Sequence, residues 1–166
     1  MEASRFEAGQ SRRIAQQGDF GRKAEVTLNV FFDSSALAKR YVEEKGSNRV
    51  QAILSTASSL AVSVICIPEI ISALCRRRRE RKLSTEEYQN AKASALSDID
   101  DATIIGMTEE VIAQAVALLE QFPLRSADAL HVACAAEWST DLFVSADDRQ
   151  CRAARAHGLR VETIKT

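Results

Sequence analysis

A chain of 166 residues is long enough for one domain with a sizeable apolar core and short for two. Its 46% hydrophobic and 27% charged residues are typical of a globular protein, and a net charge of −1 excludes attraction to nucleic acid through overall charge alone. No apolar run approaches the length of a membrane span, and four cysteines without a CxxC pair indicate free thiols in a cytoplasmic protein.

The first segment, residues 1–24, is polar, carries charges of both signs and contains three glycines. It lacks the apolar centre of a signal peptide and offers no apolar face on which to fold. We expect residues 1–24 to be a flexible N-terminal extension and residues 25–166 to form the folded domain.

Two short, β-branched and apolar runs follow, and helix-forming segments come after each of them. Ser34 or Ser35 is expected to cap the first helix, and Pro68 suits the first position of the helix after the second run. In chain order we expect a strand at 26–32, helices at 34–43 and 47–54, a strand at 60–67 and a helix at 69–79.

The second half of the chain continues this alternation. Ser84 and Glu87 make a capping box, and Thr108 opens a helix rich in alanine and leucine. We expect helices at 84–101, 108–122, 126–138 and 147–157, and strands at 102–106, 142–145 and 160–164. Strands that alternate with helices predict an α/β fold, in which a central, mostly parallel sheet is covered by helices on both faces as a three-layer α/β/α sandwich.

Four acidic residues stand where an apolar run ends or a helix begins: Asp33, Glu69, Asp128 and Asp147. Each alone is typical of a helix cap or a first helical turn. Parallel strands end at one edge of the sheet, where α/β proteins bind ligands, so the four carboxylates are expected to meet there. Carboxylates gathered in this way repel one another unless a hard cation such as Mg²⁺ neutralises them. The set therefore favours a metal-dependent phosphodiesterase.

The same residues carry a resemblance to a known family. FFDSSALAKRYVEE, SVICIPEIISAL, SADALHVACA and LFVSADDRQCRAARAHGL occur in the order found in PIN domains of the VapC type, the toxins of bacterial toxin–antitoxin pairs. The resemblance covers the chain from about Leu28 to its end. It implies a PIN-like fold and a ribonuclease whose Asp33, Glu69, Asp128 and Asp147 surround one or two Mg²⁺ or Mn²⁺ ions.

We expect Asp33, Asp128 and Asp147 to bind the metal, Asp128 directly or through water, while Glu69 orients the attacking water or binds a second metal. The resemblance makes Ser34 and Ser145 supporting residues. It also favours Asp147 over the adjacent Asp148, which remains an alternative ligand. It further implies an RNA substrate, an antitoxin partner and a homodimer.

Two other features admit a functional and a structural interpretation. The basic residues Arg76, Arg77, Arg78 and Arg79 complement the C-terminal dipole of their helix, bind RNA phosphates at the rim of the acidic site, or do both. His131 lies three residues after Asp128 on one helical face, and its expected role is that of a packed or hydrogen-bonded helix residue.

Two alternative classes of protein fit these residues less well. A phosphoaspartate phosphatase of the haloacid-dehalogenase type needs a second aspartate where Ser35 stands, and a receiver domain needs an acidic pair and a lysine that are not evident. A catalytically silent module that binds RNA or protein would not require carboxylates at all four positions.

Overall fold

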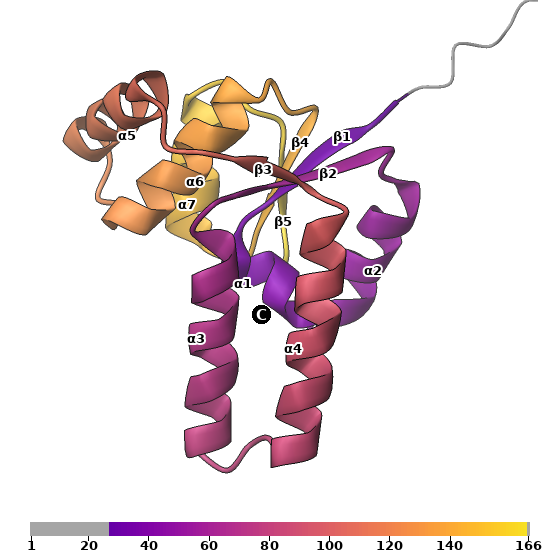
Figure 1. Cartoon of the computed structure of the whole chain (residues 1–166). Coiled ribbons are helices and arrows are strands. Elements are labelled where there is room, and N and C mark those ends of the chain that lie inside the picture. Colours follow the sequence, from indigo (N-terminus) through magenta and orange to yellow (C-terminus); the bar gives the residue numbers. More distant parts are fainter. Residues whose placement is uncertain (1–26, 166) are drawn as a thin grey trace, which may run out of the picture.

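The computed structural model describes residues 27–165, so the N-terminal extension expected at 1–24 lies outside the described part of the chain. Its five strands form one sheet in the order β3-β2-β1-β4-β5, and every neighbouring pair is parallel (Figure 1). This confirms the predicted α/β class. The strands are β1 (Asn29–Phe32), β2 (Ser59–Ser63), β3 (Thr103–Ile105), β4 (Leu142–Ser145) and β5 (Val161–Thr163).

The helices lie between these strands in the chain and cover both faces of the sheet (Figure 1). They are α1 (Ser34–Leu37), the 3₁₀ helix η1 (Ala38–Arg40), α2 (Ser47–Thr56), α3 (Cys66–Arg79), α4 (Thr85–Asp100), α5 (Glu109–Gln121), α6 (Ser126–Glu137) and α7 (Asp148–Ala156). Helices α3 and α4 form a long hairpin that extends away from the sheet. Among the described residues no helix is both long and apolar enough to cross a membrane.

Successive residues of the central strand enter two separate cores. Val30 and Phe32 pack with α1 to α4 on one face of the sheet, whereas Phe31 packs with α5 to α7 on the other. Phe31 stacks against Phe143 of β4 with ring centroids 6.0 Å apart. Because the strand is buried on both faces, its sequence is a continuous apolar run rather than an alternating one. The strand is therefore held rigidly up to its last residue, which precedes Asp33.

The helix starts expected at Ser84 and Thr108 are confirmed. Ser84 Oγ accepts a hydrogen bond from the backbone N–H of Glu87 at 3.1 Å, and the Glu87 carboxylate accepts one from the Ser84 N–H at 2.7 Å. Thr108 caps α5 through the N–H of Val111 at 3.2 Å. These local signals were sufficient because a cap depends only on residues within one turn.

Two expectations about the first helix were wrong. The cap of α1 is Asp33 rather than Ser34 or Ser35, since its Oδ1 accepts from the Ala36 N–H at 2.9 Å. The first helix was expected to reach residue 43, but α1 and η1 end at Arg40. The Ser47 hydroxyl donates to the Lys39 carbonyl at 2.7 Å, and this bond satisfies a carbonyl at the helix end.

The second apolar run of the sequence forms β2, which ends at Ser63 and not at the predicted residue 67. Val64 makes one last backbone bond to Ile105, and Ile65 then adopts a helical conformation that leads into α3 at Cys66. Pro68 consequently stands at the third position of the helix instead of the first. It is tolerated there because the N–H groups of a first helical turn have no partner within the helix.

Candidate active site

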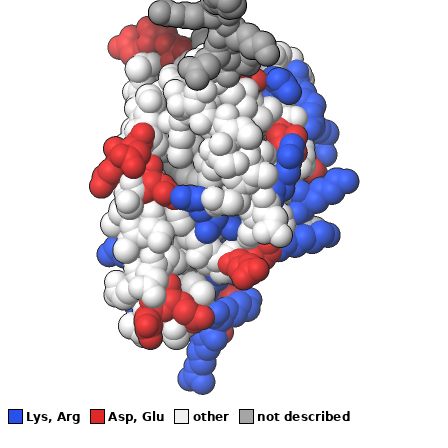
Figure 2. Space-filling view, turned by 90° about the vertical axis from the view of Figure 1, so that its right-hand side faces the viewer, with Lys and Arg blue, Asp and Glu red and all other residues white. Residues whose placement is uncertain are grey.

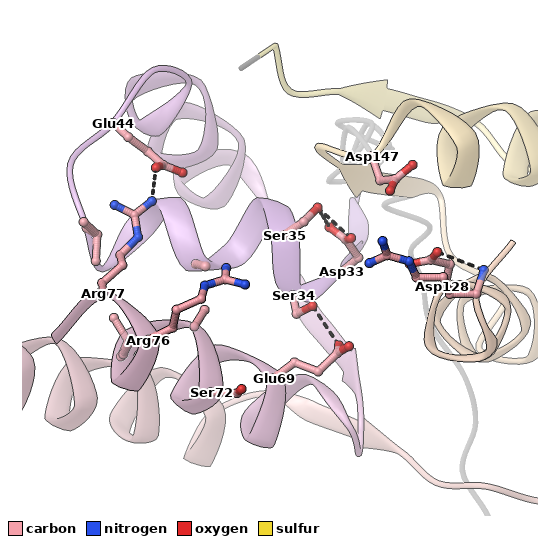
Figure 3. Close-up of a pocket in the computed structure, with 15 residues that line it drawn as sticks. Asp33, Ser34, Ser35, Glu44, Glu69, Ser72, Arg76, Arg77, Asp128 and Asp147 are labelled. Atoms are coloured by element: carbon pink, nitrogen blue, oxygen red, sulfur yellow. Dashed lines mark hydrogen bonds and ion pairs between the residues drawn. The ribbon is translucent and has the colours of Figure 1, made fainter. Parts of the chain in front are cut away.

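The carboxyl ends of the strands open into a pocket of about 440 Å³, and all four predicted acidic residues line it. Asp33 follows β1, Glu69 lies in the first turn of α3, Asp128 lies in the first turn of α6 and Asp147 precedes α7. Figure 3 shows these side chains around one cavity, although they come from elements far apart in the sequence. The topology therefore brings together the four carboxylates that the sequence singled out.

Asp33 is the most buried of the four, at 2% exposure. Its two oxygens accept bonds from the Ser35 hydroxyl at 2.9 and 2.7 Å, and its backbone N–H donates to the Val144 carbonyl of β4 at 3.0 Å. Burial raises the pKa of the Asp33 carboxyl, and the charge of His131 and the bonds from Ser35 and Ala36 offset this only in part. The side chain is fixed on the sheet edge and lacks full compensation for its negative charge.

Glu69 faces the pocket and is held by two side chains. The Ser34 hydroxyl donates to Glu69 Oε2 at 2.8 Å, and His131 Nε2 lies 2.6 Å from the same oxygen. Burial acts to raise the pKa of Glu69, but the bonds from His131 and Ser34 outweigh it and the pKa is lowered. Glu69 is therefore an ionised carboxylate with a defined orientation.

Asp128 and Asp147 are held mainly by backbone N–H groups at the starts of their helices. Asp128 Oδ2 accepts from the Arg125 N–H at 3.1 Å, and Asp147 Oδ1 accepts from the N–H groups of Arg149 and Gln150 at 2.7 and 3.2 Å. Burial acts to raise the pKa of Asp147, but the backbone bonds from Gln150 and Arg149 outweigh it and lower the pKa. The N-terminus of α7 thus stabilises the charged form of Asp147.

The predicted supporting residues have different surroundings. Ser34 binds Glu69, as described above, and Ser145 is fully buried with its hydroxyl accepting from the Asp147 N–H at 3.0 Å. Asp148 is exposed and does not line the pocket, whereas Asp147 does. The position of Asp147 therefore agrees with its expected role better than that of Asp148.

The predicted basic run divides between two surroundings. Arg76 and Arg77 line the pocket, and Arg77 forms an ion pair with Glu44, which also binds the buried Lys39 at 2.7 Å. Arg78 instead lies over the ring of Tyr88, 4.5 Å from its centroid. Arg79 is exposed and outside the pocket lining. Half of the run thus faces the acidic site across the cavity, and half does not.

Lysine and arginine side chains gather along one edge of the face shown in Figure 2, with acidic side chains interspersed. Although the net charge is only −1, charged side chains of both signs form local patches on the surface. Attraction to nucleic acid depends on such local patches and not on the overall charge.

Several residues around the pocket carried no functional assignment from sequence. Arg125 lines the cavity beside Asp128, and Ser35 clamps Asp33. Gln150 is buried at 1% exposure, and its Nε2 lies 3.4 Å from Asp128 Oδ1. The local pattern gave a signal only for Ser35, a hydroxyl two residues after Asp33. The others reach the site through packing of distant segments.

The donor chemistry of the pocket suits a hard divalent cation, because carboxylate and hydroxyl oxygens are the ligands that Mg²⁺ takes in proteins. The incompletely compensated charge of Asp33 also favours a cation. Within residues 27–165, no three acidic, histidine or cysteine side chains are already arranged around one point. Mg²⁺ usually keeps several waters and takes one or two carboxylates, so the oxygen donors of this pocket fit such an ion.

A model of the PIN domain family matches residues 30–156, so the chain belongs to the PIN domain family. The chain is 30% identical over 134 residues to ribonuclease VapC46 of Mycobacterium tuberculosis, and the match covers 80% of this chain and 95% of that protein. The resemblance inferred from the four sequence blocks is thereby confirmed.

Solved structures agree with the fold. VapC20 of Mycobacterium tuberculosis, a toxin that cleaves the sarcin–ricin loop, gives a TM-score of 0.59 at 17% identity, covering 78% of this chain and 95% of that one. VapBC2 of Rickettsia felis, solved with a DNA fragment from its promoter, gives 0.59 at 13% identity, covering 81% and 97%. Because the sequence identities are low, the structural similarity establishes the PIN-like architecture alone.

Proposed function

We propose that this protein is an endoribonuclease that depends on Mg²⁺ or Mn²⁺ and hydrolyses RNA phosphodiester bonds as the toxin of a toxin–antitoxin pair. The observation that carries the proposal is the pocket at the strand ends, where four carboxylates from four separate elements face arginine side chains. Membership of the PIN domain family and the likeness to ribonuclease VapC46 support the reaction class.

In this proposal the acidic residues of the pocket bind the metal and orient water. Asp33, Asp128 and Asp147 would hold the ion, which when bound polarises phosphodiester oxygens and makes water a better nucleophile. Glu69, ionised and fixed by two hydrogen bonds, orients the attacking water or contributes to a second ion. Buried Asp33 gives the cavity a negative charge that water cannot screen well.

The arginine side chains that line the pocket, which we call the basic wall, bind the substrate in this proposal. They belong to Arg76, Arg77 and Arg125. Arg76 and Arg125 line the pocket and, among the residues described, form no salt bridge to a carboxylate. They are therefore available for the phosphates on either side of the cleaved bond. Arg77 is paired with Glu44 and must give up part of that contact to bind RNA. Arg78 and Arg79 would act outside the pocket as weaker phosphate contacts.

The partner in this proposal is a small antitoxin that covers the acidic pocket, since related folds include the VapBC2 complex. A homodimer and a cytoplasmic location remain predictions. The nuclease domain is proposed to span residues 25–166, and deletion of residues 1–24 should leave the thermal midpoint nearly unchanged. A fall of several degrees would instead show that the segment packs on the domain.

The alternative classes receive less support. A phosphoaspartate enzyme needs a free nucleophilic carboxylate, but both oxygens of Asp33 accept bonds from Ser35. A silent binding module gives no reason for placing four carboxylates around one cavity.

The decisive experiment measures cleavage of labelled random-sequence RNA by purified protein after removal of divalent ions, and again after addition of Mg²⁺ or Mn²⁺. We expect cleavage only with the ion, and cleavage slower by about 10³-fold or more in an Asp33→Asn variant. Equal cleavage with and without chelator would refute the metal-dependent reaction. A short neighbouring gene that encodes a DNA-binding protein would independently support the toxin assignment.

A further inference from the structure

His131 occupies an unusual position for a residue that merely fills a helix. It is buried at 1% exposure, and both nitrogens of its ring have partners from other elements. Nδ1 lies 2.9 Å from the hydroxyl of Ser63 at the end of β2, and Nε2 lies 2.6 Å from Glu69 Oε2 in α3. An ordered chain of hydrogen bonds therefore runs from the sheet, through α6, to a carboxylate that faces the pocket.

This series of hydrogen bonds fixes one oxygen of Glu69. Both His131 and Ser34 bind Oε2, so Oε1 takes no part in either bond. A glutamate side chain has several rotatable bonds, and a half-buried one without such contacts would sample several orientations. With Oε2 held between an imidazole and a hydroxyl, the second oxygen can face the cavity in one direction.

Ser63 keeps this arrangement intact in either protonation state of the ring. An ionised carboxylate only accepts hydrogen bonds, so His131 Nε2 must carry a proton toward Glu69. The Ser63 hydroxyl can donate to Nδ1 of a neutral ring and accept from Nδ1 of a charged one. Ser63 is itself completely buried, so it does not exchange this partner for water.

We propose that His131, held by Ser63, is a positioning residue that fixes Glu69 for RNA cleavage. This inference rests on the proposed ribonuclease function and adds a role that neither the carboxylate pattern nor the pocket lining contains. A positive charge on the same ring would also act to lower the pKa of Asp33.

A double-mutant cycle tests the inference. His131→Leu should lower kcat by about 10- to 100-fold with little change in KM, the usual scale for a residue that orients an active-site group. His131→Gln should recover part of the loss, because an amide nitrogen can reach the place of Nε2. In a Glu69→Gln background, His131→Leu should cause little further loss, since the group that it positions is already altered.

Val132→Ala is the matched control, because Val132 is completely buried on the same helix and packs in the core away from the Glu69 contact. It should lower the thermal midpoint at least as much as His131→Leu while leaving kcat nearly unchanged. Equal losses of kcat in both variants, or fully additive losses of His131→Leu and Glu69→Gln, would overturn the positioning role.

A spectroscopic readout separates this inference from the proposed function. In the unaltered protein without metal or RNA, the His131 Nε2 proton should give a downfield-shifted nuclear magnetic resonance signal, as expected for a bond of 2.6 Å. Glu69→Gln should move this signal strongly and Asp147→Asn should not. A signal insensitive to Glu69→Gln would overturn the inference, whereas an intact signal in a protein that cleaves no RNA would uphold the contact and refute the ribonuclease proposal.

Discussion

The two sides of the pocket hold their carboxylates by different means. Asp33 and Glu69 are bound mainly by side chains, the hydroxyls of Ser34 and Ser35 and the imidazole of His131. Asp128 and Asp147 are bound mainly by backbone N–H groups at helix starts. Backbone donors remain whatever the side chains are, so the second arrangement is robust to substitution and the first is not.

This difference also bears on charge. Burial leaves Asp33 with a raised pKa, while helix N-termini lower the pKa of Asp147. Asp33 therefore bears an electrostatic cost in the absence of a cation, whereas Asp147 does not. A site that combines the two can gain stability when an ion binds and still hold its ligands in place beforehand.

The largest effect is expected from Asp33→Asn. Cleavage should fall by about 10³-fold or more, as for the loss of a group at the centre of a catalytic site. The metal-free variant should be no less stable than the native protein, since Asn keeps the shape and the cap but carries no charge. Calorimetry should show weaker binding of Mn²⁺. Native levels of both binding and cleavage would leave Asp33 a simple helix cap.

The pH dependence of this variant has a definite sign. Because burial raises the pKa of Asp33 above its ordinary 3.8, the cost of its charge is absent below about that pH. The cost grows while the carboxyl ionises in the unfolded chain but keeps its proton in the folded protein, and it is constant above the raised pKa. The stability advantage of Asp33→Asn over native protein, measured by metal-free denaturation, should therefore increase as pH rises from about 4. An advantage that shrinks with rising pH would contradict the burial of this charge.

The next largest effect tests the helix-capped side. Asp147→Asn should lower cleavage by about 10²-fold or more, while the exposed Asp148→Asn should change it by no more than about threefold. The two variants are matched, because they make the same chemical change at adjacent positions. The reverse ranking would show that the ligand lies one residue later.

Much of this architecture could be predicted from the sequence, because it rests on local patterns. Apolar runs gave the five strands, and residues one turn apart gave the caps at Ser84 and Thr108. The four acids were identifiable for the same reason, since each adjoins a strand end or a helix start. Their meeting in one pocket followed from the parallel topology.

The remaining features depend on packing between distant segments. Glu69 and His131 are 62 positions apart in the sequence, and Ser63 and His131 are 68 apart. No local spacing therefore reveals the hydrogen bonds that join the three side chains. Arg76, near the end of α3, and Arg125, just before α6, line one cavity although they come from distant segments of the chain. The end of the first helix was missed because it is set by Ser47 from the following helix.

A smaller effect is expected on the basic wall. Arg76→Ala should weaken RNA binding several-fold across sequences and reduce the slope of log K against log salt by about 1, as for the loss of one phosphate contact. Arg79→Ala, outside the pocket, is the control and should change both quantities less. Binding measured over a series of salt concentrations decides this, and equal effects of both variants would mean that the run acts only through its total charge.

The smallest effect compares one supporting side chain from each side. Ser35→Ala removes the hydroxyl that binds both oxygens of Asp33 and accepts from the Ala146 N–H at 3.0 Å. Gln150→Leu removes a single 3.4 Å bond to Asp128 and also a buried Oε1 that has no partner in the described structure.

Loss of an unsatisfied buried polar atom offsets loss of a long bond, so Gln150→Leu should change the free energy of unfolding by less than about 1 kcal/mol and leave kcat nearly unchanged. Ser35→Ala should lower kcat more, because it removes a hydroxyl that binds both oxygens of Asp33. Denaturant unfolding and single-turnover cleavage measured on both variants provide the comparison. A larger loss of kcat in Gln150→Leu would show that the helix-capped carboxylates also depend on side-chain support, and the distinction between the two sides of the pocket would then fail.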